Sequence, residues 1–147
     1  MRLRHIPGSE EFVRRASATV NEPERYRGKW SAFFREDAPL ALEIGMGKGR
    51  FLRELSAREP GWNFLGLERY ASVLQKAIER KEREEREQGK KERENLFFLW
   101  EDAKRLTEIF APGEVARIYL NFSDPWPKAG HAMRRLTSRG FLKLYDA

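Results

Sequence analysis

The amino-acid sequence predicts a doubly wound α/β domain with a mostly parallel sheet. Four short apolar runs alternate with segments of helical periodicity, which is the pattern of parallel strands joined by right-handed crossovers. Each run is followed by glycines or by acidic residues, at the end of a strand where such sheets bind ligands. The 147 residues, 40% of them hydrophobic, have room for one core of this kind.

Residues 1–39 differ in composition from the rest of the chain. They mix charged residues, prolines and glycines with aromatic side chains and show no sustained period of either kind; the aromatic residues are Phe12, Tyr26, Trp30, Phe33 and Phe34. We therefore expect an N-terminal basic and aromatic arm over residues 1–39 that docks through its aromatic side chains. The α/β domain itself is expected over residues 40–147.

The first half of the domain shows a strand, a glycine loop, a helix and a second strand. Residues 40–44 are a short apolar run that ends in the sequence Gly-Met-Gly-Lys-Gly. Phe51, Leu52 and Leu55 follow at helical spacing, and Pro60-Gly61 ends this helix. Residues 62–68 then read as a second strand with Glu68 at its end.

The next helix is expected from Ala71 to about Glu87. Its first half carries Val73, Leu74, Ala77 and Ile78 on one face, and its second half, residues 79–87, is entirely charged. Glutamates and arginines four residues apart in this tract can pair across one helical turn. We interpret the tract as a solvated helix end rather than a binding surface.

The second half of the domain contains two more strands. Residues 95–100 form a third apolar run, followed by Glu101-Asp102 and a short helix through Phe110; residues 115–122 form a fourth. A last amphipathic segment, 133–145, has as its apolar contacts Leu136, Phe141, Leu142 and Tyr145. With about four strands the sheet would be incomplete, which indicates a truncated chain, and we expect the strand ending at Phe122 to be an unpaired edge.

The glycine loop is the first motif with chemical meaning. Gly45, Gly47 and Gly49 allow a tight turn and a close approach of a ligand to main-chain amides. A nicotinamide-binding fingerprint would have its third glycine at the position of Arg50. The spacing instead resembles motif I of S-adenosylmethionine-dependent methyltransferases, although a glycine-rich turn without a ligand is an alternative. Glu43, just before the loop, can face the cationic end of a methionine-like ligand.

Two further carboxylates fall at the ends of strands. Glu68 lies about 20 residues beyond the loop, where a carboxylate can accept hydrogen bonds from both ribose hydroxyls; its alternative is an ordinary surface glutamate. Asp102, after the third strand, would by the same topology lie near an adenine. Asp102 is equally well explained as a helix N-cap.

The most specific motif lies in residues 119–128, Tyr-Leu-Asn-Phe-Ser-Asp-Pro-Trp-Pro-Lys, continued by His-Ala-Met-Arg-Arg-Leu-Thr-Ser at 131–138. This stretch closely resembles the signature of the tRNA (guanine-N7-)-methyltransferase family. The similarity includes residues 42–49, 113–115, 1–4 and 26–30, and covers essentially the whole chain apart from the charged segment near 81–94. It implies a Rossmann-like methyltransferase fold and an enzyme that transfers a methyl group from S-adenosylmethionine to N7 of a guanine in tRNA.

The resemblance also implies roles for particular residues. Glu43, Glu68 and Asp102 would bind S-adenosylmethionine together with the glycine loop, Asp124 would be the central active-site residue and Lys128 would contact the substrate. The segment that would touch RNA contains Gly130, His131, Arg134 and Arg135. The chain departs from the family at Ala129-Gly130 and Met133, where basic residues are expected. The Thr-Asp-Asn and Thr-x-Tyr-Glu-like stretches that complete the family's pocket are absent from this sequence.

Two other functions remain open at this point. A catalytically incomplete chain could still bind tRNA, because residues 125–147 carry five Lys or Arg against one Asp, that is +4 of the net +6. The same charge could also simply make the surface more soluble. A nicotinamide-dependent oxidoreductase of similar topology is the third possibility, disfavoured by Arg50 and by the Asp-Pro-Trp-Pro loop.

Composition excludes several classes of chemistry. The chain has no cysteine and only two histidines, so we expect no metal centre, disulfide or cysteine nucleophile. No run of about 18 apolar residues is present, and the N-terminus lacks an apolar signal segment, so we expect a cytoplasmic protein with no membrane partner. The pattern leaves the oligomeric state open.

Overall fold

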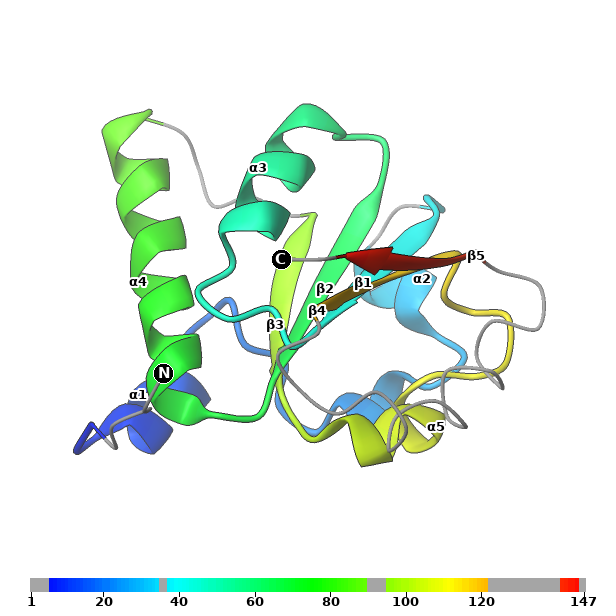
Figure 1. Cartoon of the computed structure of the whole chain (residues 1–147), viewed down its shortest axis with the longest axis horizontal. Helices are drawn as coiled ribbons and strands as arrows, with labels where there is room; N and C mark the ends of the chain where they lie inside the picture. Colours follow the sequence, from blue (N-terminus) through cyan, green and yellow to red (C-terminus); the bar gives the residue numbers. More distant parts are fainter. Residues whose placement is uncertain (1–5, 35–36, 90–94, 122–140, 146–147) are drawn as a thin grey trace.

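The computed structural model describes residues 6–34, 37–89 and 95–121, and the main chain of residues 141–145 (Figure 1). Its centre is a five-stranded sheet in the order β3-β2-β1-β4-β5, with every neighbouring pair parallel. The strands are β1 (Leu40–Ile44), β2 (Asn63–Glu68), β3 (Leu96–Trp100), β4 (Arg117–Asn121) and β5 (Phe141–Tyr145). The predicted parallel α/β sheet is therefore confirmed.

The fifth strand corrects one expectation. β5 pairs with β4 over its whole length, from Arg117 opposite Phe141 to Asn121 opposite Tyr145. The expectation that the strand ending near residue 122 is an unpaired edge is thus wrong. Within the predicted amphipathic segment 133–145, the last five residues form a strand, and the rest lies outside the described residues. Five residues rich in aromatic and aliphatic types suit a short strand, but they are too few to show a clear period.

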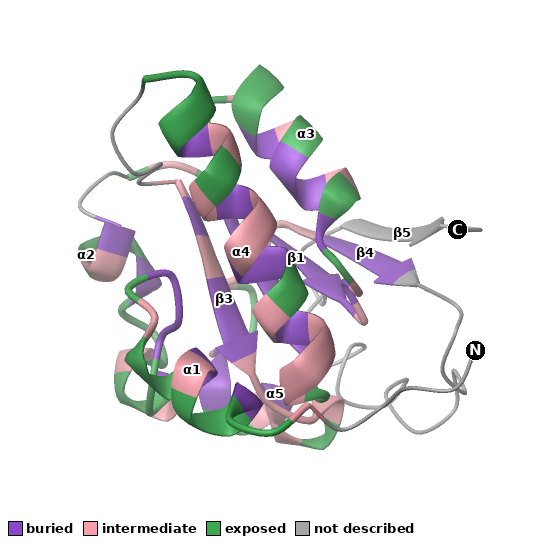
Figure 2. Ribbon diagram, turned by 90° about the vertical axis from the view of Figure 1, so that its left-hand side faces the viewer, coloured by how far each residue is buried: buried purple, intermediate pink, exposed green. Residues whose placement is uncertain are grey.

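Helices cover both faces of the sheet, which makes it doubly wound. One face carries α3 (Arg50–Arg58) and α4 (Ala71–Glu87), with α1 (Ser9–Arg15) packed against α4. Figure 2 shows α3 and α4 lying side by side in front of the strands. The other face carries α2 (Trp30–Phe34), α5 (Leu106–Ile109) and the short 3-10 turns η1 (Pro23–Tyr26) and η2 (Ala103–Arg105).

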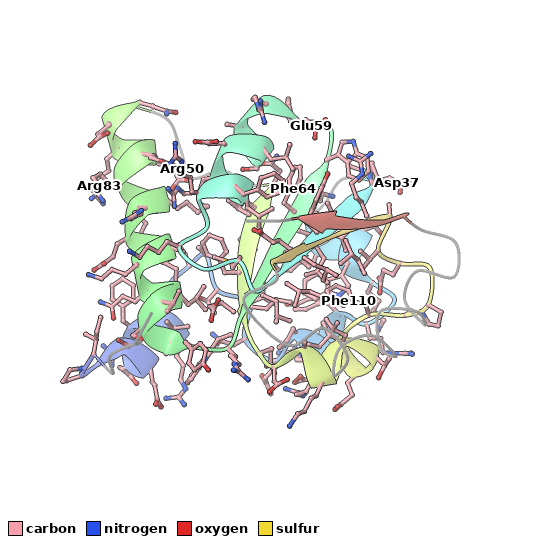
Figure 3. The ribbon with its side chains drawn as sticks, in the orientation of Figure 1. Asp37, Arg50, Glu59, Phe64, Arg83 and Phe110 are labelled. Atoms are coloured by element: carbon pink, nitrogen blue, oxygen red, sulfur yellow. The ribbon has the colours of Figure 1, made fainter. Side chains whose placement is uncertain are left out.

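Two hydrophobic clusters form the core, one on each face. Along β1, Leu40, Leu42 and Ile44 belong to the cluster with α2 and α5, whereas Ala41 belongs to the cluster with α3 and α4. Phe64 and Phe110, both labelled in Figure 3, represent the two clusters. β1 and β2 are buried along their whole length, as expected for strands covered on both sides.

The N-terminal arm contacts both faces and one edge of the sheet. Residues 18–20 run beside β3, where the amide of Phe98 donates to the oxygen of Ala18 at 2.8 Å and the amide of Val20 donates to the oxygen of Phe98 at 2.9 Å. Trp30 is buried against Phe110, and its indole nitrogen donates to the oxygen of Ile109 at 3.0 Å. The arm thus packs through its aromatic residues; its division from the domain at residue 40 stays a prediction.

The charged half of α4 departs from its predicted solvated character. Lys81 and Glu85 are both buried and form an ion pair of 2.8 Å. They continue the helical stripe of Leu74, Ala77 and Ile78 that faces the core. The prediction of a solvated helix end is wrong at these two positions, where the opposite charges of Lys81 and Glu85 pair with each other and offset part of the cost of their burial.

Candidate functional site

The glycine loop lies at the carboxyl end of β1 and is tied to the end of β2. The amides of Gly45 and Met46 both donate to the oxygen of Leu67, at 2.9 and 3.2 Å. Gly47 and Gly49 have φ angles of 60° and 76°, in the left-handed region that glycine adopts without strain. This turn leads directly into α3, so the loop joins the central strand to the helix N-terminus in the manner of nucleotide-binding folds.

Glu68 ends β2 and faces the loop. One carboxylate oxygen accepts the amide of Gly47 at 3.1 Å, and the other accepts the amide of Tyr70 at 3.1 Å. The side chain is buried, with 7% of its surface exposed. An ordinary surface glutamate would have neither feature. A carboxylate is an acceptor-only group, so a ligand hydroxyl that reaches Glu68 could donate a hydrogen bond to it.

Glu43 is a buried carboxyl at the centre of the same end of the sheet. It stands opposite Gly66 of β2 and Tyr119 of β4, and only 5% of it is exposed. Its Oε1 atom has no hydrogen-bond partner among the described residues. Burial, and secondarily the negative charge of Glu68, raise the pKa of Glu43 to about 8. A buried acceptor without a donor can receive a hydrogen-bond donor, and a cationic donor would lower the pKa of Glu43 and favour its ionised form.

Asp102 lies one strand further along the same edge. Its carboxylate accepts the amide of Lys104 at 2.9 Å and so caps η2, which is one of the two roles expected for it. It also lines a pocket of about 420 Å³ between the ends of β2 and β3, together with Arg69, Tyr70, Trp100 and Glu101. Cap and pocket wall are compatible roles, because the capping bond uses only one oxygen.

Sequence reasoning missed three residues of this site. Tyr70, 39% exposed, and Trp100 form the aromatic part of the pocket wall. Gly66, inside β2, lets the loop pack down on the sheet, because a Cβ there would lie 2.8 Å from Leu52 Cδ1 and even closer to the sulfur of Met46. An isolated glycine inside an apolar strand is a signal of close approach that was available in the sequence.

The remaining predicted site residues cannot be placed. Asp124, Lys128, Gly130, His131, Arg134 and Arg135 lie outside the described residues. Among the residues that are described, no three His, Cys, Asp or Glu side chains come together as a metal site. In the same part of the chain, no helix has the length and apolarity to cross a bilayer.

Solved structures share this fold. The antibiotic-resistance methyltransferase Kmr superposes with a TM-score of 0.58 at 22% identity, over 75% of this chain and 59% of that protein. Phosphoethanolamine N-methyltransferase 2 of Haemonchus contortus, solved with S-adenosylhomocysteine, gives 0.52 at 21% identity, over 67% of this chain and 22% of that protein. The fold is therefore that of a Rossmann-like methyltransferase.

Comparison of the amino-acid sequence with known proteins identifies the family. Residues 37–147 match the model of the Methyltransf_4 family, described as putative methyltransferases, and the chain belongs to this family. The tRNA (guanine-N(7)-)-methyltransferase of Lachnoclostridium phytofermentans is 51% identical over 146 residues, and that of Brevibacillus brevis is 47% identical over 145. The predicted resemblance is confirmed. Each match covers 99% of this chain, which spans 65% and 64% of the two relatives.

Proposed function

We propose that this chain carries the cofactor-binding part of an enzyme that transfers a methyl group from S-adenosylmethionine to N7 of a guanine in tRNA. The proposal depends on one observation: a buried carboxyl with an unpartnered oxygen, Glu43, lies next to a glycine loop that is anchored by a second carboxyl, Glu68. The relatives named as tRNA (guanine-N(7)-)-methyltransferases supply the reaction and the substrate. A tRNA substrate would put this activity in the cytoplasm.

The described residues fit S-adenosylmethionine. Glu43 would pair with its α-ammonium group, which would supply the hydrogen-bond donor that Oε1 lacks. Gly45, Gly47 and Gly49 would let the ligand approach the main chain, since no Cβ stands in the way. Glu68 would accept the ribose hydroxyls, and the pocket lined by Asp102 would hold the adenine.

The bound cofactor supplies an electrophilic methyl group on a sulfonium. Guanine N7 already carries an in-plane lone pair, so no proton has to leave before the methyl group is attacked. The protein's contribution is then to hold the two reactants in line. Glu43 and Glu68 serve this purpose by fixing the two ends of the cofactor relative to the sheet.

The residues expected to bind the guanine and the rest of the tRNA belong to the segment that follows β4 in the sequence. We propose that Asp124 orients the purine by accepting hydrogen bonds and stabilises the positive charge that develops on it. Lys128 would contact the substrate. Gly130, His131, Arg134 and Arg135 would lie along the RNA, with the two arginines on phosphates.

Binding measurements and a methyl-transfer assay test the proposal. Calorimetry should detect binding of S-adenosylhomocysteine and no binding of NAD. The reverse preference would favour a nicotinamide-dependent oxidoreductase. Transfer of labelled methyl groups from S-adenosylmethionine to unmodified tRNA should then be measured, and Asp124→Ala in a version as long as the relatives should abolish transfer while cofactor binding remains. Retained tRNA binding without any transfer would instead identify a tRNA-binding fragment.

A further inference from the structure

A second pocket adjoins the proposed adenine pocket. It measures about 520 Å³, lies between the arm and the end of β3, and is lined by Arg14, Thr19, Asn21, Glu22, Trp100 and Glu101. Trp100 and Glu101 also line the first pocket, so the two pockets share a wall. In Figure 1, α1 lies at the same lower side of the molecule to which the carboxyl ends of β2 and β3 point.

The shared wall provides a stacking surface. The Arg14 guanidinium lies 5.1 Å from the centre of the Trp100 ring. The ring is held in place because its nitrogen donates to the oxygen of Arg69 at 3.0 Å. Within the arm, Asn21 donates to the oxygen of Arg14 at 2.9 Å, which ties the end of α1 to the residues that line the pocket. Unpaired nucleotides stack on aromatic rings and on arginine planes of this kind.

Hydrogen-bond acceptors surround this surface. The carboxylates of Glu101 and Glu22 are partly neutralised by Arg105 at 2.6 Å and Arg25 at 3.6 Å, so they can accept N–H groups of a base without repelling an RNA strongly. The hydroxyl of Thr19, a residue with 9% of its surface exposed, has no partner among the described residues. A buried polar atom without a partner is rare and needs an explanation, which a ligand would provide.

The main chain is also unusual here. Glu22 has φ 52° and ψ 55°. Among the described residues it is the only one other than glycine with a positive φ. This conformation costs a non-glycine residue free energy, and such costs concentrate at functional sites. The strain therefore falls on a residue that lines the pocket rather than on a remote turn.

We propose that this pocket binds one unpaired nucleotide of the tRNA, distinct from the target guanine; the inference rests on the proposed function. The sheet order separates the two nucleotides, because β3 is one edge of the sheet and β4, after which the Asp124 segment begins, lies beyond β2 and β1. An RNA that presents its guanine near β4 and extends along the carboxyl edge would reach the Arg14–Trp100 surface with another nucleotide. Both contacts would then flank the cofactor.

The test is tRNA binding by fluorescence anisotropy, with Arg14→Ala, Arg14→Lys and a matched control. Arg15→Ala is the control, because Arg15 is the next residue of the same helix, has the same charge and is 80% exposed against 55% for Arg14. Arg14→Ala should weaken binding at least about fivefold more than Arg15→Ala, the size of one lost stacking contact. Arg14→Lys should stay weak, because an ammonium group keeps the charge but not the plane.

The outcomes separate this inference from the proposed function. Equal effects of Arg14→Ala and Arg15→Ala, or full rescue by lysine, would overturn the pocket and leave the methyltransferase proposal intact. Free GMP and AMP should compete with tRNA only weakly; competition at micromolar concentration would overturn the assignment to RNA. If the unsubstituted chain binds S-adenosylhomocysteine but no tRNA, the nucleotide pocket is overturned and the proposed cofactor site stands; if it binds tRNA but no S-adenosylhomocysteine, the proposed cofactor site is overturned. Unchanged thermal unfolding of the variants shows that the fold is retained.

Discussion

The main-chain amide of Gly47 donates a hydrogen bond of 3.1 Å to the carboxylate of Glu68, which ties the loop after β1 to the end of β2. The same carboxylate also accepts the amide of Tyr70, at the start of α4. Glu68 therefore organises the loop even before any ligand arrives. If it also binds a ribose, one side chain both builds the site and recognises its occupant.

Replacing this carboxylate should weaken cofactor binding. Glu68→Ala removes two hydrogen bonds to a charged acceptor, each worth about 1.5–3 kcal/mol, and frees the loop. We expect calorimetry to show at least a tenfold loss of affinity for S-adenosylhomocysteine. Glu87→Ala, an exposed glutamate on α4, is the control. Undiminished affinity of the Glu68 variant would contradict the role given to this carboxylate.

Glu43 should make the stability of the unliganded chain depend on pH. The carboxyl has its ordinary pKa of 4.5 when the chain is unfolded and a pKa of about 8 when it is folded. Between these values the folded chain binds the extra proton, so its contribution to the free energy of unfolding is fully present below about pH 4.5 and is lost as the pH rises through 8.

The expected slope is at most about 1.4 kcal/mol per pH unit. Urea unfolding from pH 5 to 8.5 would measure it, and Glu43→Gln, which cannot ionise, should show a flatter curve and a more stable fold at pH 8. Parallel curves for the two proteins would mean that Glu43 is not a buried acid of this kind.

Gly66 should tolerate no side chain. Gly66→Ala would place a Cβ against Met46 and Leu52, and overpacking of this kind costs about 1–3 kcal/mol. We expect a lower midpoint of thermal unfolding together with weaker cofactor binding, because Met46 belongs to the loop. Gly61→Ala is the matched control, since a Cβ there meets nothing within 4 Å. Equal stability of both variants would count against the close packing.

Glu114 should hold the arm in place. Its carboxylate accepts the amides of Gly28 at 2.8 Å, Trp30 at 3.1 Å and Ala111 at 2.9 Å. Glu114→Ala leaves three donors without this partner, and we expect a loss of about 2–4 kcal/mol in the free energy of unfolding by urea. Glu108→Ala, with 62% of its side chain exposed, should change stability by less than about 0.5 kcal/mol. Similar losses in both would argue against the anchor.

Local patterns allowed most of the domain to be predicted. The apolar runs of β1 to β3 and the helical stripe of α4 are properties of neighbouring residues, and they predict elements close to those observed. The arm was harder, because α1 has seven residues and α2 has five, too few for a period to show. Lys81 and Glu85 were misjudged because charge usually marks solvent, and only the packing of α4 shows that this pair is buried.

The sequence by itself determined the order of strands and helices, the glycine loop, and the presence of Glu43, Glu68 and Asp102 at the ends of strands. Only the tertiary structure decided that Gly47 and Glu68, 21 positions apart, form a hydrogen bond. It also decided that one oxygen of Glu43 has no hydrogen-bond partner among the described residues and that β5 pairs with β4. The physical reason is that secondary structure follows from local periodicity, whereas burial, protonation and hydrogen bonding depend on which distant segments the fold brings together.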